Sequence, residues 1–303
     1  MIQLSLIIAT YNRATPLIHA LESVVEQDAD PTTWECVVVN NNSRDDTEER
    51  FAEFAARYPT LNLRMVCQKQ QGLSHARNCG IAQSTGAIIA IIDDDERINA
   101  GFISAYIHFF DHHPTIVAAG GRIIPEYPAG RPTWMSRYVE QPIANPIDLG
   151  NTVREFPIGR IPGGGNMALQ RSAIDCYGAF DPTLGRTGTK LIGGEESDLF
   201  ERLARAGERC YYVPEAIMWH IIPPEKLTAD YFARLCYNVG VSQRARAEMN
   251  HRVAKTIALE CAKWGATLAI GAWYAVQMQP TRAAWLIRMR RQISRGLFFT
   301  AQP

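Results

Sequence analysis

The chain has 303 residues, of which 47% are hydrophobic and 20% are charged, and its formal net charge at pH 7 is zero. This length and composition allow a large core in one or two domains, and the balanced charge argues against a general nucleic-acid-binding protein. The seven cysteines are odd in number and form no Cys-x-x-Cys pair, which favours a reducing compartment over a disulfide framework.

The first 96 residues alternate short apolar runs with amphipathic segments. The runs over residues 4–9, 34–39 and 88–92 are rich in β-branched residues and predict buried strands, and residues 61–66, in which apolar and polar residues alternate, predict a further strand. The segments between them have helical spacing and predict helices over residues 16–27 and 47–58, and a loop followed by a helix over residues 72–83. This alternation predicts an α/β fold with a mainly parallel sheet flanked by helices. Because the first strand begins almost at residue 1 without a basic segment, we expect no signal peptide and a cytoplasmic location.

Four acidic residues, Asp93, Asp94, Asp95 and Glu96, follow the fourth run directly. The carboxyl ends of strands are where open α/β sheets bind ligands. Clustered carboxylates repel one another unless a positive charge lies between them. Hard oxygen ligands suit Mg²⁺ or Mn²⁺, usually shared with substrate phosphates. We therefore expect a divalent metal site here, the alternative being a solvated acidic turn.

The middle of the chain is less regular. Residues 102–112 predict a helix and residues 117–124 a strand, and residues 125–162 are rich in Pro, Gly and aromatics without a clear period. Long irregular segments of this kind are usually binding loops or lids. A helix is predicted over residues 199–206, and short strands over 210–213 and 217–222.

The character of the sequence changes after Pro224. Helices are predicted over residues 228–250, 251–279 and 282–295, so we place an α/β domain over 1–224 and a helical extension over 225–303. From Cys261 onward there are six Lys and Arg residues and no acid, so this tail carries +6 and the rest −6. A basic amphipathic helix with Trp and Phe can lie in a membrane interface. The alternatives are packing on the α/β domain or on a partner subunit.

Five motifs in register give the chain a resemblance to the family 2 glycosyltransferases with the GT-A fold. They are Ser5–Arg13, Val37–Thr47, Gly72–Gly80, Gly86–Asp95 and Gly193–Leu203. The resemblance covers roughly residues 2–222. It implies a nucleotide-diphospho-sugar transferase fold with a nucleotide-binding half over 1–96 and an acceptor-side half over 97–224.

On the donor side, the resemblance implies that Thr10, Tyr11 and Arg13 lie beside the sugar nucleotide, with Arg77 near the donor and the acid cluster. Asn40 stands where the family often has an Asp that reads the nucleotide base. An Asn can both donate to and accept from a base edge, so this departure leaves the base open, with a UDP-sugar favoured. The structural alternative is that Asn40 belongs only to a turn.

The Asp-x-Asp motif of the family corresponds to Asp93 and Asp95, with Asp94 between them. By resemblance, an earlier acid contacts the ribose or the sugar, whereas Asp95 binds the Mn²⁺ or Mg²⁺ that bridges the diphosphate. Asp93 is the second candidate ligand. His220 is either a further metal or diphosphate ligand, as in several related enzymes, or a satisfied core histidine, and the sequence does not favour one reading.

The catalytic base of the family is the second acid of a Glu-Asp-x-Asp motif, which here is Glu196. Glutamate can accept the same proton, but its longer side chain keeps Glu195 as an alternative. Asp198 is expected to stabilise the helix start or to support the base on the acceptor side. Gly164, Gly165 and Asn166 are expected to line the acceptor sugar.

The resemblance therefore implies a metal-dependent inverting glycosyltransferase that uses a sugar nucleotide and a hydroxyl acceptor on a growing glycan or a lipid-linked glycan. We expect no nucleic-acid partner, and peripheral contact with the inner face of a membrane, or an oligomer, through the C-terminal helices. One alternative is a nucleotidyltransferase of the same fold, which the lack of glycine in residues 9–13 disfavours. Another is a catalytically weak or non-catalytic sugar-nucleotide-binding protein.

Overall fold

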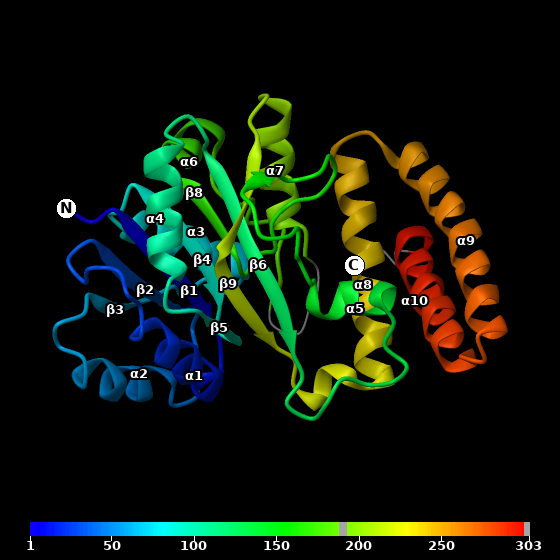
Figure 1. Ribbon diagram of the computed structural model, residues 1–303, viewed down its shortest axis with the longest axis horizontal. Coiled ribbons are helices and arrows are strands. Elements are labelled where there is room, and N and C mark those ends of the chain that lie inside the picture. The colour runs from blue at the N-terminus through cyan, green and yellow to red at the C-terminus, as the bar shows by residue number, and fades with distance from the viewer. Residues whose placement is uncertain (188–192, 300–303) are drawn as a thin grey trace. The chain divides into compact units, whose positions relative to one another are not determined.

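The computed structural model describes residues 1–187 and 193–299 (Figure 1). The chain divides into two compact units. We call residues 1–124, 147–187 and 195–221 the sheet unit, and residues 125–146, 193–194 and 222–299 the helical unit. Residues 125–146 were predicted to belong to the α/β domain, but they pack with the C-terminal helices.

The sheet unit is built on a nine-stranded sheet with the order β3-β2-β1-β4-β8-β6-β9-β5, to which β7 adds by pairing with β9. The strands are β1 (Leu4–Thr10), β2 (Trp34–Asn40), β3 (Leu63–Cys67), β4 (Ile88–Asp93), β5 (Glu96–Ile98), β6 (Ala118–Glu126), β7 (Arg154–Glu155), β8 (Met167–Gln170) and β9 (Cys210–Ile221). Strands β1 to β4 pair in parallel, as predicted. Strand β8 runs antiparallel to β4 and β6, so the sheet as a whole is mixed.

Helices cover both faces of the sheet because its strands are apolar on both sides. On one face, Leu4, Leu6 and Ile8 of β1 pack with helices α1 (Ala14–Val24), α2 (Thr47–Ala56) and α4 (Phe102–His112). On the other face, Ile7 packs with helices α3 (Leu73–Gln83), α6 (Arg171–Tyr177) and α7 (Glu195–Arg205). The result is a three-layer α/β/α arrangement, visible in Figure 1.

Several elements were not predicted from the sequence. Strands β5, β7 and β8 have two to four residues, which is too short for a periodic signal. Helix α7 begins at Glu195, not at Leu199, so its acidic residues form its first turn. Acids in this position are stabilised by the helix dipole.

The helical unit contains α5 (Arg137–Ala144), the short 3₁₀ helix η1 (Pro224–Leu227), α8 (Ala229–Met249), α9 (Val253–Val276) and α10 (Pro280–Phe298). Its core includes Phe232 of α8 and a stacked pair of rings, Trp134 and Trp285, whose centroids are 3.8 Å apart. Pro280 separates α9 from α10 and occupies the first turn of α10, where a missing N–H is tolerated. Within residues 1–187 and 193–299, we find no helix with the length and hydrophobicity needed to cross a membrane.

Helices α8 and α10 touch backbone to backbone at two glycines. A Cβ atom on Gly240 would lie 2.0 Å from the carbonyl oxygen of Ile293, and one on Gly296 would lie 1.9 Å from that of Tyr237. Both neighbours are main-chain atoms, which cannot move aside without shifting a helix. Glycine is therefore required at both positions for this packing.

Replacing Gly296 with alanine is expected to destabilise the protein by about 1–3 kcal/mol through overpacking. Gly265 in α9 is the matched control, because a Cβ there meets nothing within 4 Å. The Gly265→Ala change is expected to stabilise by about 0.5–1 kcal/mol, since alanine is the better helix former. Urea unfolding of the two variants measures both effects, and equal stability of the two would contradict the close packing of α8 and α10.

Candidate active site

The acidic residues predicted from the sequence lie at the carboxyl edge of the parallel strands. Asp93 ends β4, and Asp94 and Asp95 form the turn that leads into β5. The hydroxyl of Thr10, at the end of the neighbouring strand β1, donates a hydrogen bond to Asp94 Oδ2 at 2.8 Å. Adjacent parallel strands therefore bring the first motif and the acid cluster together.

Arg13 binds the two acids of this turn. Its Nη1 lies 3.1 Å from Asp94 Oδ1, and its Nη2 lies 3.0 Å from Asp95 Oδ2. Burial raises the pKa of Asp94 to about 7, and Arg13 acts in the opposite direction. Arg13 is 37% exposed, so the guanidinium closes the solvent side of the acid pair. Tyr11, two residues earlier, is partly buried on the same loop.

Arg77 of α3 is the centre of a second group of charges. Its Nη2 donates to Asp93 Oδ1 at 3.0 Å and to the carbonyl oxygen of Gly164 at 3.1 Å. Its Nη1 donates to Glu196 Oε1 at 3.0 Å and to Glu195 Oε1 at 3.3 Å. The side chain is only 1% exposed. Burial alone would lower the pKa of Arg77, but Asp93 and the two glutamates raise it above its ordinary value, so the guanidinium stays charged.

The two candidate bases differ in exposure and protonation. Glu195 is buried, and burial together with the neighbouring Glu196 raises its pKa to about 8, so at neutral pH it is mostly the uncharged acid. Glu196 is 21% exposed. Burial would raise the pKa of Glu196, but Arg77 holds it below the ordinary value. Of the two, Glu196 is therefore the ionised carboxylate that reaches the open side of the site.

Two glycines allow the chain to lie directly against the acids. A Cβ atom on Gly164 would lie 1.9 Å from Glu196 Oε1, and one on Gly165 would lie 1.9 Å from Glu96 Oε1. Glu96 is buried and accepts a hydrogen bond from the Asp93 amide at 2.7 Å. Burial and the charge of Asp93 raise the pKa of Glu96 well above its ordinary value. Glu96 thus supports the acidic turn, and His220 lies beside it on β9, in register.

Other predicted site residues have their side chains engaged within the fold. Asn166 is fully buried, where its amide donates to the carbonyls of Arg122 and Ala216 and accepts from Tyr106. Asp198 binds Arg202, one turn along α7, at 2.9 Å. The buried Asn166 therefore holds the glycine loop in place through these hydrogen bonds, and Asp198 holds Arg202 on α7 while its side chain stays partly exposed.

The side chains of Asn40 and Asn41 have different roles in the loop after β2. The side-chain oxygen of Asn40 accepts from the Ser43 amide at 2.9 Å, which shapes the turn. Asn41 was not singled out in the sequence, yet its side chain binds the main chain of Gln68, Gln70 and Gly72. It fixes the entry to α3 and so the position of Arg77. Two adjacent asparagines gave no signal to tell these roles apart.

The acid cluster fits a divalent cation by its chemistry. The site holds six carboxyl groups, from Asp93, Asp94, Asp95, Glu96, Glu195 and Glu196, and Arg13 and Arg77 bind five of them. Within the described parts of the chain, no three His, Cys, Asp or Glu side chains are arranged as a ready-made cage. Mg²⁺ and similar ions often take only one or two protein carboxylates and complete their coordination with substrate phosphates and water. Asp95 and the partly exposed Asp93 meet that requirement.

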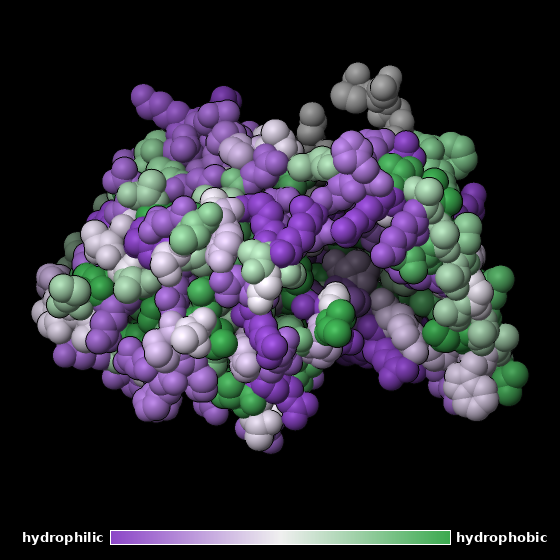
Figure 2. Space-filling view, turned by 90° about the horizontal axis from the view of Figure 1, so that it is seen from above, coloured by the Kyte–Doolittle hydropathy of each residue, from purple (hydrophilic) through white to green (hydrophobic). Residues whose placement is uncertain are grey.

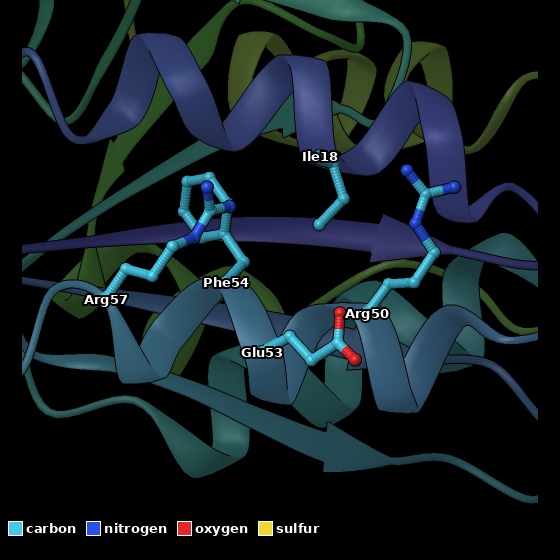
Figure 3. A pocket seen from close by; sticks show the side chains of 5 residues that line it. All are labelled: Ile18, Arg50, Glu53, Phe54 and Arg57. Atoms are coloured by element: carbon cyan, nitrogen blue, oxygen red, sulfur yellow. The ribbon is translucent and has the colours of Figure 1, made fainter.

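A separate pocket of about 320 Å³ lies between α1 and α2 (Figure 3). Its lining residues are Ile18, Arg50, Glu53, Phe54 and Arg57. The guanidinium of Arg57 lies 4.8 Å from the centre of the Phe54 ring, and Arg50 donates to the hydroxyl of Thr15. None of these lining residues belongs to the acid cluster, so the pocket and the candidate active site are different places.

Comparison with known proteins gives consistent matches. The model of a family described as "Glycosyl transferase family 2" matches residues 5–178. The chain is 24% identical over 248 residues to the glucosyl-dolichyl phosphate glucuronosyltransferase of Haloferax volcanii, covering 80% of this chain and 76% of that protein. It is 27% identical over 273 residues to the succinoglycan biosynthesis protein ExoM of Rhizobium meliloti, covering 87% and 82%.

Two solved structures are similar to this protein over nearly its whole length. The mannosyltransferase PcManGT from Pyrobaculum calidifontis, in complex with GDP-Man and Mn²⁺, superposes with a TM-score of 0.62 at 20% identity, covering 99% of this chain and 88% of that one. S. aureus TarS 1-349, in complex with UDP-GlcNAc, gives a TM-score of 0.56 at 17% identity, covering 97% and 91%. At these identities the likeness establishes the fold alone.

Proposed function

The chain belongs to glycosyl transferase family 2, and on this premise we propose that it transfers a sugar from a nucleoside-diphosphate sugar to an acceptor hydroxyl with inversion at the anomeric carbon. The GT-A fold and the glycosyltransferase activity predicted from the sequence are confirmed by the family match and the relatives. One observation carries the mechanistic proposal. The Arg77 guanidinium binds Asp93 and Glu196 from separate nitrogens, each at 3.0 Å, which joins the donor-side acids to the candidate base.

The proposed reaction forms one bond to the anomeric carbon of the donor sugar and breaks another. The acceptor oxygen forms a bond to the anomeric carbon while the bond from that carbon to the phosphate oxygen breaks. The nucleoside diphosphate leaves with the bonding electrons, and the acceptor proton passes to the carboxylate of Glu196. Arg77 keeps Glu196 ionised before attack and holds its orientation, which is the state that a general base needs. Attack opposite the leaving group inverts the configuration.

On the donor side we assign Thr10, Tyr11, Arg13 and Asn40 to the nucleotide, with Asp93 and Asp94 toward the ribose and sugar. The support is their place at the carboxyl edge of β1, β2 and β4, where α/β sheets bind ligands. A UDP-sugar remains the favoured donor. A GDP-sugar is the main competitor, because similar structures were solved with GDP-Man and with UDP-GlcNAc.

We assign a divalent metal, Mn²⁺ or Mg²⁺, to Asp95, with Asp93 as the second carboxylate. When bound, such a metal neutralises the charge that develops on the departing diphosphate. The support is the excess of carboxylates and the Mn²⁺ in a structurally similar mannosyltransferase. His220 is the candidate third ligand. Because it pairs with Glu96 in the sheet, it could equally hold the acidic turn in place.

We propose a growing glycan, carried on a lipid, as the acceptor, with the backbone of Gly164 and Gly165 facing it. One relative is a glucosyl-dolichyl phosphate glucuronosyltransferase, and another is a succinoglycan biosynthesis protein. With an acceptor of this kind, we propose that the enzyme works at the inner face of a membrane.

A thermal-shift screen of UDP- and GDP-sugars with Mn²⁺ tests the donor and the metal together. A donor present at about 100 times its Kd is expected to stabilise the protein by about 2.7 kcal/mol. Asp95→Ala is expected to lose most of this shift, because the carboxylate assigned to the metal is gone. Glu48→Ala, which removes an exposed acid at the start of α2, is the matched control and is expected to keep the shift.

Product analysis then separates the possible activities. Release of a nucleoside diphosphate with transfer to a glycan supports the proposal. Formation of a sugar nucleotide with release of pyrophosphate would identify a nucleotidyltransferase, and donor binding without turnover would identify a binding protein. An Asp95→Ala protein with an unchanged Mn²⁺-dependent shift would refute the metal assignment.

A further inference from the structure

Helix α9 exposes the side that a surface helix normally buries. Leu268, Trp273 and Val276 are 57%, 59% and 75% exposed, and Leu259, nearer the start of the helix, is 51% exposed. No charged residue occurs from Gly265 to Val276, and most of the other exposed positions are alanines. In Figure 2 hydrophobic residues of the C-terminal helices gather on the right of the view.

The buried side of α9 includes several polar side chains. Glu260 is buried and binds Arg290 of α10 at 3.0 Å and the hydroxyl of Ser294 at 2.8 Å. Trp264 donates to the same Ser294 at 2.9 Å, and Thr267 is also buried. A helix of a water-soluble protein usually directs its apolar stripe inward and its polar side outward. In α9 the polar side chains of Glu260 and Thr267 are buried while Leu268, Trp273 and Val276 are exposed, so its outer face is suited to a non-aqueous neighbour.

The exposed charges of α9 and α10 are positive. Lys255 and Lys263 are exposed on α9, and Arg291 and Arg295 are exposed on α10. The one acid in the sequence from Val253 to Phe299 is Glu260, which is buried against Arg290. Apart from the buried Glu260 these two helices have no acid, so the surface that they expose combines apolar side chains with cations.

We propose that the outer face of α9 with the cations of α9 and α10 binds the surface of an anionic lipid bilayer. Trp and the aliphatic side chains suit the interfacial layer, and Lys and Arg suit the negatively charged headgroups. A second copy of the chain is the less suitable occupant. A two-fold interface brings the same patch of both copies together, which would oppose these cations to one another. The use of this surface rests on the proposed function, in which the acceptor is carried on a lipid.

Vesicle flotation of the full chain tests the surface without relying on catalysis. We expect binding to phosphatidylcholine vesicles that contain phosphatidylglycerol, weak binding to phosphatidylcholine alone, and release at high salt. The double variant Trp273→Gln/Val276→Gln is expected to bind at least about tenfold more weakly, since it removes two apolar side chains from the interface. Ile158→Gln is the matched control, because Ile158 is a fully exposed aliphatic residue of the sheet unit, and it is expected to bind like the unaltered protein.

A second pair of variants tests the charges. Arg291→Gln/Arg295→Gln is expected to weaken binding to the anionic vesicles and to reduce its salt dependence, whereas Arg209→Gln, at an exposed arginine of the sheet unit, is expected to do neither. Circular dichroism melts verify that each variant folds.

Equal binding of Trp273→Gln/Val276→Gln and Ile158→Gln would overturn the proposal. So would a dimer in sedimentation that Trp273→Gln/Val276→Gln dissociates, without vesicle binding by either protein. Donor hydrolysis in solution is measured on the same proteins. If the unaltered protein hydrolyses the donor but does not bind the vesicles, the membrane-binding proposal is wrong and the proposed function stands. If it binds the vesicles but does not hydrolyse any donor, the proposed function is contradicted and the membrane-binding surface stands.

Discussion

Glu196→Gln is expected to lower kcat by about 10²–10⁴-fold, the usual contribution of a positioned general base. Glutamine keeps the size of the side chain and one acceptor for the Arg77 hydrogen bond, but it cannot take a proton from the acceptor hydroxyl. Donor binding measured by thermal shift is expected to stay close to that of the unaltered protein, because the change is confined to proton transfer. Steady-state transfer assays with a saturating donor provide the measurement.

Glu195→Gln is the matched control for that experiment. Burial and the charge of Glu196 raise the pKa of Glu195 to about 8, so glutamine resembles the uncharged form that prevails at neutral pH. We expect Glu195→Gln to retain most of its turnover and stability at pH 7. If Glu195→Gln lost more turnover than Glu196→Gln, the two roles would have to be exchanged.

Arg77→Met is expected to cost about 3–5 kcal/mol of folding free energy, as found when one partner of a buried ion pair is removed. The change leaves Asp93, Glu195 and Glu196 without the guanidinium that binds all three. Turnover is expected to fall as well, since Glu196 loses the charge that lowers its pKa. Urea unfolding monitored by tryptophan fluorescence measures the stability.

Two further variants show whether the effect comes from the site. Arg44→Met, on an exposed loop after β2, is expected to change stability by no more than about 0.5 kcal/mol. Arg77→Lys is expected to recover only part of the loss, because an ammonium group cannot reproduce the planar donors that reach acids on both sides. An Arg77→Met protein as stable as Arg44→Met would show that the three acids are neutralised in another way.

The first half of the sheet unit could be predicted because its signals are local. Strands β1, β2 and β4 are short, rich in β-branched residues and buried on both faces. In the helices between them, the apolar residues recur with helical spacing. The location of the acids after Ile92 could be predicted for the same reason, because the end of a buried strand lies at the edge of the sheet. Helix α5 escaped prediction because Pro142 lies inside it, which argues against a helix.

The connections within the site could not be predicted because they depend on the topology. Arg77, Gly164 and Glu196 lie far apart in the sequence, and no periodicity links them. The sequence placed Arg77 near the donor and the acid cluster, whereas its hydrogen bonds also reach the candidate base. Similarly, nothing in Asn40 and Asn41 shows which one turns its amide toward the main chain of Gly72.

The pairing of β5 with β9 has a consequence for the order in which the protein is completed during synthesis. Glu96 follows the acidic turn at once, but its partner in the sheet is His220. Domains fold as the chain emerges, N-terminal residues first, and a long loop must close before such a distant pair can form. A ribosome-bound chain that ends before β9 can pair β1 to β4, yet its acidic turn has no second strand to hold it. The site of the transferase is therefore completed late, once β9 has joined the sheet. A chain that terminates before β9 is expected not to consume sugar nucleotides.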